Sequence, residues 1–169
     1  KNASLGEMLR ALGDRGVRVP QGFVLTADAF RLHLREAGLT EWIDRTLAPV
    51  DTRDVRAVAE AGQAIRARVR EAPLPPVLVP AVAAAYAELS GRYGETATDV
   101  AVRSSATAED LPGASFAGQH ETYLNVRGLP ALDAAIRACF ASLYTDRAIV
   151  YRTEHGFAHS QVALSVGVQ

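Results

Sequence analysis

The chain has 169 residues and 49% of them are hydrophobic, which is enough for one globular domain with a sizeable core. Its 18 basic and 19 acidic residues leave a formal net charge of -1, so composition gives no excess positive charge of the kind that binds nucleic acid or acidic membranes. A single cysteine excludes an internal disulfide framework, and no apolar run reaches the ~20 residues of a membrane span.

Cap residues mark the expected helix starts in the first half of the chain. Ser4 is followed three residues later by Glu7, as in a capping box, and a helix is predicted over about 5–13. Thr26 is a natural N-cap for a helix that runs to about residue 37. Two further helices are expected to begin at caps of the same kind, Thr40 and Asp51.

A short strand at 23–25 is expected after the turn at 20–22. The proline-rich stretch at 72–76 is too short to be a domain linker, because a helical pattern resumes at 80–93. The chain is therefore interpreted as a single domain over residues 1–169, and its abrupt end at Gln169, inside strand-like sequence, indicates a partial one.

The second half is expected to contain three strands and two helices. Strands are predicted at 99–103, 122–126 and 162–168, and helices at about 129–143 and 145–155. In the first of these strands, Val100 and Val102 share one face. The first two strands are expected to pair like a hairpin around a long loop at 104–120. Many helices with few strands predict an α+β or α/β-like fold, helix-rich with a small sheet.

The loop between these two strands has the composition of a phosphate-binding segment. Its small residues let backbone N–H groups approach an anion closely; they are Ser104, Ser105, Ala106, Gly113, Ala114, Ser115, Ala117 and Gly118. Arg103 precedes the loop and can present a fixed fork of donors to phosphate oxygens. The residues alone leave two interpretations open, a phosphate site and an ordinary surface loop.

Two common nucleotide-binding motifs are excluded. The chain has no G-x-G-x-x-G run, which argues against a Rossmann dinucleotide site. Gly113 and Gly118 have the spacing of a P-loop, but Gln119 and His120 occupy the positions where Lys and Ser or Thr are required.

Several segments, in the same order along the whole chain, resemble the phosphoenolpyruvate synthase / pyruvate phosphate dikinase family, of which rifampicin phosphotransferase is a close relative. The segments that carry this resemblance are Lys1–Met8, Val17–Thr26, Val102–Asp110, Ala114–Gln119, Glu121–Asn125, Ser142–Ala148 and Val162–Gln169. The resemblance implies the N-terminal, ATP-binding lobe of an ATP-grasp fold.

The resemblance also implies which residues hold the nucleotide. Lys1 and Arg103 match the family positions that contact phosphates, and Arg103 is the one carried over as catalytic. Lys1 is also the only lysine among the 18 basic residues. Positions beside the nucleotide are matched by Gly113, Ser115, Gly118, Thr122 and Gln169, with Gln169 at the edge of the adenine pocket.

In the family, ATP phosphate passes through a phosphohistidine to pyruvate, giving phosphoenolpyruvate. The resemblance implies ATP as ligand, Mg²⁺ held by carboxylates outside this chain, and a cytoplasmic enzyme. Its expected partners are the remaining ATP-grasp lobe and the phosphohistidine domain of a longer protein, and neither nucleic acid nor a membrane. The chain alone is expected to show no dikinase turnover. Two alternatives stay open, a rifampicin-type antibiotic phosphotransferase and a non-catalytic nucleotide-binding module.

Four other conspicuous residues are assigned structural roles. Cys139 lies in an apolar helical stretch and is expected to be a buried hydrophobe. Trp42 is expected in the core. His155 and His159 are four residues apart, but Gly156 lies between them, and we interpret both as structural or surface histidines.

Overall fold

The computed structural model describes residue 7 and residues 20–106 and 121–169. Apart from residue 7, the helix expected at 5–13 lies outside this part of the chain, and so does most of the expected loop, residues 107–120. The described helices and strands share one continuous cluster of buried hydrophobic residues.

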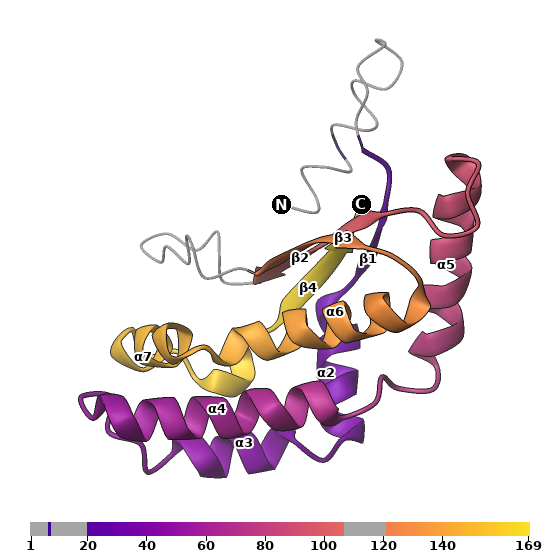
Figure 1. Ribbon diagram of the computed structural model, residues 1–169. Helices are drawn as coiled ribbons and strands as arrows, with labels where there is room; N and C mark the ends of the chain where they lie inside the picture. The colour runs from indigo at the N-terminus through magenta and orange to yellow at the C-terminus, as the bar shows by residue number, and fades with distance from the viewer. Residues whose placement is uncertain (1–6, 8–19, 107–120) are drawn as a thin grey trace.

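The sheet has four strands in the order β1-β4-β2-β3, and every neighbouring pair is antiparallel. The strands are β1 (Phe23–Leu25), β2 (Val100–Ala106), β3 (Thr122–Val126) and β4 (Leu164–Val168). The last strand, β4, lies between β1 and β2, so segments far apart in sequence are side by side in the sheet (Figure 1). The hairpin-like pairing expected for the second and third strands is confirmed.

The structure describes six α-helices: α2 (Ala27–Glu36), α3 (Thr40–Leu47), α4 (Val55–Glu71), α5 (Leu78–Arg92), α6 (Leu129–Ala141) and α7 (Asp146–Glu154). Two 3₁₀ turns, η2 (Ser142–Tyr144) and η3 (His159–Gln161), flank α7. Helices α2 and α6 pack against the sheet, α4 packs against α6, and α3 lies beside α4 (Figure 1). The helix-rich α+β class predicted from the sequence is confirmed.

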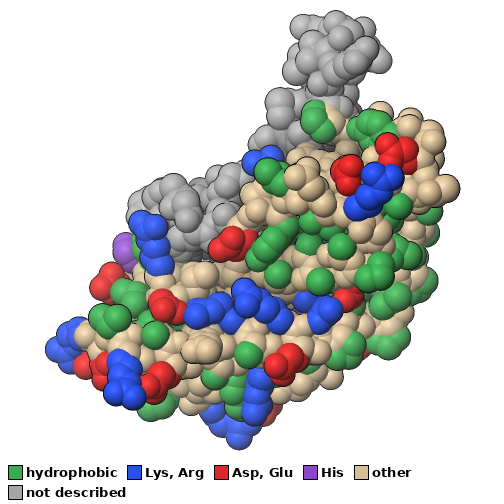
Figure 2. Space-filling view, viewed as in Figure 1, with side chains coloured by type: hydrophobic (Ala, Val, Ile, Leu, Met, Phe, Trp, Pro, Cys, Tyr) green, Lys and Arg blue, Asp and Glu red, His purple; other side chains and the backbone are tan. Residues whose placement is uncertain are grey.

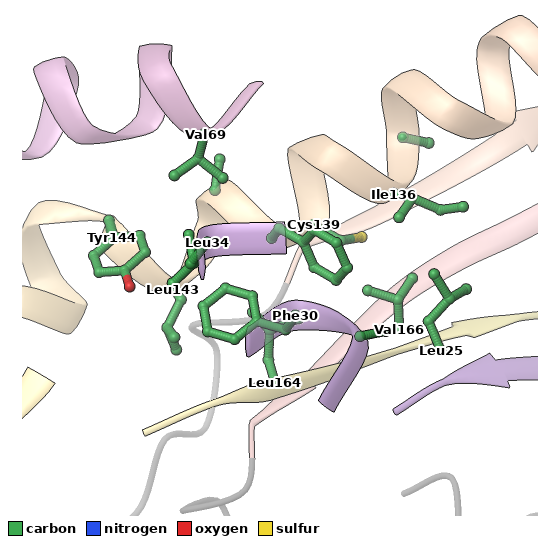
Figure 3. Packing of buried hydrophobic residues seen from close by; sticks show 14 of the residues in the cluster. Leu25, Phe30, Leu34, Val69, Ile136, Cys139, Leu143, Tyr144, Leu164 and Val166 are labelled. Atoms are coloured by element: carbon green, nitrogen blue, oxygen red, sulfur yellow. The ribbon is translucent and has the colours of Figure 1, made fainter. Parts of the chain in front are cut away.

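The core lies between the sheet and helices α2 and α6. Val102, Val166 and Val168 alternate with outward residues along their strands and are fully buried. Phe30 of α2 meets Phe140 of α6 edge-on, with ring centroids 5.5 Å apart, and Figure 3 shows Phe30 above Leu164 of β4. Each such side chain stabilises the fold by about 1.5–3 kcal/mol.

The helix caps differ from the sequence prediction at two positions. Asp54, rather than Asp51, caps α4, because its carboxylate accepts hydrogen bonds from the backbone N–H groups of Arg56 and Ala57 at 3.0 and 3.1 Å. Asp51 instead accepts from the Arg53 N–H and closes the preceding turn. Thr40 is the first residue of α3 and its hydroxyl does not cap the helix. Thr26 occupies the N-cap position of α2, also without a side-chain cap bond.

Charged side chains of both signs are interspersed over the face shown in Figure 2, in keeping with the near-zero net charge. Within residues 20–106 and 121–169, no helix combines the length and the apolar character needed to cross a membrane.

Candidate functional site

One row of residues crosses the sheet from edge to edge on a single face. Arg103 of β2 pairs with Thr122 of β3 on one side and with Gly167 of β4 on the other, and Gly167 pairs with Val24 of β1. Directly opposed residues in a sheet point to the same side. The row therefore lies on the face opposite Val102, which is buried towards the helices.

We call this face the outer face. It is defined by the row and its nearest same-side neighbours in the strands, and the members used below are Val24, Arg103, Thr122, Leu124, Gly167 and Gln169. The structure thus places on one face three of the residues that the family resemblance assigned to the nucleotide site, namely Arg103, Thr122 and Gln169. The other four, Lys1, Gly113, Ser115 and Gly118, lie outside the described residues.

Arg103 is exposed, and its guanidinium makes no hydrogen bond or ion pair with any residue in the described part of the chain. Its neighbour on β4 is Gly167, which has no side chain that could cover the guanidinium. Arg103 is therefore a cation held on a strand, with donors that no other described residue uses, and such a group suits capture of an anion.

Backbone hydrogen bonds to Ala101 hold Gln169 in place. Its N–H donates to the Ala101 carbonyl at 3.0 Å, and its own carbonyl accepts from the Ala101 N–H at 2.7 Å. Gly22 allows the chain to pass close by, because a Cβ at this position would lie 2.0 Å from the Val168 carbonyl oxygen. The half-buried Gln169 side chain lies at one end of the outer face, two residues beyond Gly167 and directly after the end of β4.

Ser104 holds together the two ends of the chain segment that follows β2 and precedes β3. Its hydroxyl accepts a hydrogen bond from the Glu121 N–H at 3.1 Å, and its backbone N–H donates to the Glu121 carbonyl at 3.2 Å. The expectation that the loop begins at residue 104 is wrong. Residues 104–106 continue β2 and are buried, because they pair with β4 along their whole length.

Sequence reasoning missed the apolar part of the outer face. Val24 and Leu124 are 43% and 67% exposed and flank the polar row. Exposed apolar side chains beside a few polar groups are typical of ligand sites. Alternation along 23–25 and 122–126 could have placed both side chains on one face of their strands. It could not have shown that the two strands belong to the same sheet.

The residues assigned structural roles have protein partners. His155 donates from Nδ1 to the Tyr151 carbonyl at 2.8 Å, and the Nδ1 of His159 accepts from the Arg152 Nε at 3.0 Å. Cys139 is buried, and burial raises the pKa of its thiol to about 12, so it stays protonated at neutral pH. Trp42 is partly buried against the core, and the Arg68 guanidinium lies 4.1 Å from its ring centroid.

No group of three or more His, Cys, Asp or Glu side chains that could hold a metal ion occurs among the described residues. The outer face in particular offers Arg, Thr and Gln side chains rather than carboxylates. Such a donor set suits an anion better than a divalent cation, which prefers carboxylate and carbonyl oxygens.

The comparisons with known proteins cover the whole chain. The family model described as the pyruvate phosphate dikinase AMP/ATP-binding domain matches residues 1–169. Phosphoenolpyruvate synthase of Deinococcus radiodurans is 56% identical over 169 residues, and that of Escherichia coli is 50% identical over the same length. A probable phosphoenolpyruvate synthase of Methanocaldococcus jannaschii is 48% identical. Each match covers 100% of this chain, but the chain spans only 21%, 21% and 14% of these relatives.

Proposed function

Since the chain belongs to the pyruvate phosphate dikinase AMP/ATP-binding domain family, we propose that its outer face binds ATP. The observation that carries the proposal is the row formed by Arg103, Thr122 and Gly167. In this row an exposed guanidinium, unpaired within residues 20–106 and 121–169, stands next to a hydroxyl on the sheet.

Arg103 donates to oxygens of the triphosphate, and the Thr122 hydroxyl adds a neutral donor beside it. The missing side chain at Gly167 leaves space for the phosphates. Gln169 lies near the base, and the exposed side chains of Val24 and Leu124, on the two opposite edge strands, offer separate apolar contacts. Lys1, Gly113, Ser115 and Gly118 complete the phosphate contacts in this proposal.

The proposed reaction of the protein to which this lobe contributes is transfer of ATP phosphate through a phosphohistidine to pyruvate, giving phosphoenolpyruvate. The names of the relatives support pyruvate as acceptor over an antibiotic hydroxyl. In this proposal Mg²⁺ neutralises charge on the phosphates and is held by carboxylates outside this chain. The second ATP-grasp lobe, the phosphohistidine domain and a cytoplasmic location are parts of the same proposal.

The proposal is tested by calorimetric titration of ATP into the complete protein. Arg103→Ala is expected to weaken ATP binding by about 1.5–3 kcal/mol, the usual contribution of a hydrogen bond to a charged group. That corresponds to roughly a 10- to 150-fold rise in Kd.

Arg56→Ala is the matched control. Arg56 is also exposed, but it lies at the start of α4 and pairs with Glu60 at 2.8 Å. ATP affinity in this variant is expected to equal that of the parent. An Arg103→Ala protein that folds normally and binds ATP as tightly as the Arg56→Ala protein would remove Arg103 from the site.

A further inference from the structure

A pocket of about 370 Å³ opens between helices α2 and α3 and the 3₁₀ turns η2 and η3. It shares no residue with the outer face. Its volume falls within the range of small-molecule sites, about 300–1,000 Å³. The pocket is therefore a candidate for a second ligand, independent of the proposed ATP site.

The two helices supply walls of opposite charge. Arg31 and Arg35 line the pocket from α2, and Glu41 and Asp44 line it from α3. Arg31 is engaged by Asp28 at 3.0 Å. Among the residues that the structure describes, the side chains of Arg35, Glu41 and Asp44 form no ion pair, so the opposite charges do not neutralise each other across the pocket.

The floor between these walls is apolar. Phe30, Leu34, Ile43 and Val162 line the pocket and are 2%, 6%, 2% and 4% exposed, respectively. Phe30 and Leu34 lie close to Tyr144 in Figure 3. An apolar floor with a few polar groups around it selects a ligand that has an apolar body and charged ends.

Tyr144 adds a donor at this floor. It lines the pocket, is only 2% exposed, and its hydroxyl has no hydrogen-bond partner within the described ranges. Burial raises the pKa of this phenol, so it keeps its proton and can donate to an acceptor.

Behind Tyr144 lies a buried positive charge. The Arg152 guanidinium is 5.6 Å from the Tyr144 ring centroid, and the residue is fully buried. Its Nε donates to His159 and its Nη1 to the Leu143 carbonyl, whereas Nη2 has no partner in the described part of the chain. A buried cation without a carboxylate beside it favours an anionic group in the neighbouring pocket.

We propose that this pocket binds a small zwitterion with an apolar side chain, that is, a free apolar α-amino acid. The carboxylate lies towards Arg35 and the Tyr144 hydroxyl, the ammonium group lies towards Glu41 and Asp44, and the side chain rests on the apolar floor. Both charges of the ligand are needed, because each wall attracts only one of them.

The test uses the complete protein and three probes of similar shape. L-Phenylalanine carries both charges, 3-phenylpropanoate lacks the ammonium group, and 2-phenylethylamine lacks the carboxylate. Titration calorimetry is expected to show L-phenylalanine binding about three- to fivefold more tightly than either analogue, the scale of one partly exposed ion pair.

Two variants test whether the charged side chains of α2 and α3 cause the preference for L-phenylalanine. Arg35→Gln is expected to abolish the advantage of L-phenylalanine over 2-phenylethylamine, and Asp44→Asn its advantage over 3-phenylpropanoate. Both residues are exposed, so neither change should unfold the protein. Glu36→Gln and Arg45→Gln, on the same two helices but outside the pocket lining, serve as controls and should leave both preferences unchanged.

Three results would overturn the proposal. The first is the absence of saturable L-phenylalanine binding in the complete protein, which would mean that water or another part of the protein fills the pocket. The second is equal affinity for all three probes. The third is a preference for L-phenylalanine that persists in both Arg35→Gln and Asp44→Asn.

Discussion

Arg103 offers the phosphate two features that a lysine could not combine, a permanent charge and a planar fork of donors. It also stands on a strand whose other face is anchored by the fully buried Val102. The guanidinium therefore needs little reorganisation when an anion arrives, which favours binding.

A second substitution separates the contribution of the Arg103 charge from that of its fork of donors. Arg103→Lys keeps the charge but loses the fork, so we expect its ATP affinity to fall between those of the parent and of Arg103→Ala. Titration of the three proteins at one salt concentration measures this order. Equal affinities for Arg103→Lys and Arg103→Ala would mean that the fork, rather than the charge, accounts for the whole contribution.

The lowered pKa of His159 predicts how the free energy of unfolding depends on pH. Burial, together with the neighbouring Arg152 guanidinium, lowers the pKa of His159 to about 4 in the folded chain, and burial also lowers the pKa of His33. Both groups titrate near 6.5 in an unfolded chain. Between these values the unfolded state binds more protons, so the free energy of unfolding falls as the pH drops from about 6.5 towards about 4.

Urea unfolding of the complete protein at pH 7 and pH 5 measures this loss. His159→Asn keeps a hydrogen-bond acceptor near the Arg152 Nε but cannot be protonated. The variant should lose less stability between the two pH values than the parent. A loss of the same size in both proteins would show that His159 does not contribute to the pH dependence.

At the scale of elements, the start of α4 shows how two similar residues divide their roles. Asp51 and Asp54 both precede the helix, and the sequence pattern favoured the first. In the structure the N-cap is Asp54. The Asp54 N–H donates to the Asp51 carbonyl, and this bond closes a tight turn before the helix. A cap pattern predicts that a helix begins nearby, but choosing between two neighbouring acids needs the backbone geometry.

Removal of the α4 cap should therefore have a larger effect than removal of its neighbour. Asp54→Ala is expected to destabilise the protein by about 1 kcal/mol, the typical contribution of an N-cap. Asp51→Ala is the matched control and should be less destabilising, because among the described residues the Asp51 carboxylate bonds only to the exposed Arg53. Chemical denaturation of both variants measures the difference, and the reverse order would contradict the assignment.

Gly22 sets how closely the chain entering β1 approaches the end of β4. An added methyl group would meet backbone atoms, the Val168 carbonyl oxygen at 2.0 Å and the Gln169 Cα at 3.1 Å, which cannot rotate away. Gly22→Ala is expected to cost about 1–3 kcal/mol, as overpacking typically does. Gly91→Ala is the control, because nothing lies within 4 Å of a Cβ at that position. Equal stability of the two variants in thermal denaturation would contradict the close approach.

At the scale of the whole molecule, the sequence predicted the α+β class, the β2–β3 pairing and most element positions. These depend on local periodicity, caps and turns, which a single chain segment carries in its own residues. The order β1-β4-β2-β3 was not predicted, since pairing between strands separated by several helices is a tertiary property. The resemblance to the family grouped Arg103, Thr122 and Gln169, whereas the place of Val24 and Leu124 on the same face became visible only in the assembled sheet.

Because the chain covers only a small part of its relatives' length, we expect it not to catalyse the reaction alone. It spans 21%, 21% and 14% of the length of the three relatives named above. Phosphoryl transfer depends on metal-bound phosphates and a positioned acceptor, which the proposal places elsewhere. The purified 169-residue chain is therefore expected to release no AMP from ATP in the presence of pyruvate and Mg²⁺. ATP-dependent AMP release by this chain, measured by chromatography, would show that the catalytic apparatus is complete within it.

The central claim is that the outer face of the sheet holds the nucleotide. It is tested most directly by an experimental structure of the complete protein with a non-hydrolysable ATP analogue. We expect the triphosphate within hydrogen-bonding distance of the Arg103 guanidinium, about 2.7–3.2 Å, with the base towards Gln169. A nucleotide bound away from the outer face, with Arg103 still unpaired, would contradict it.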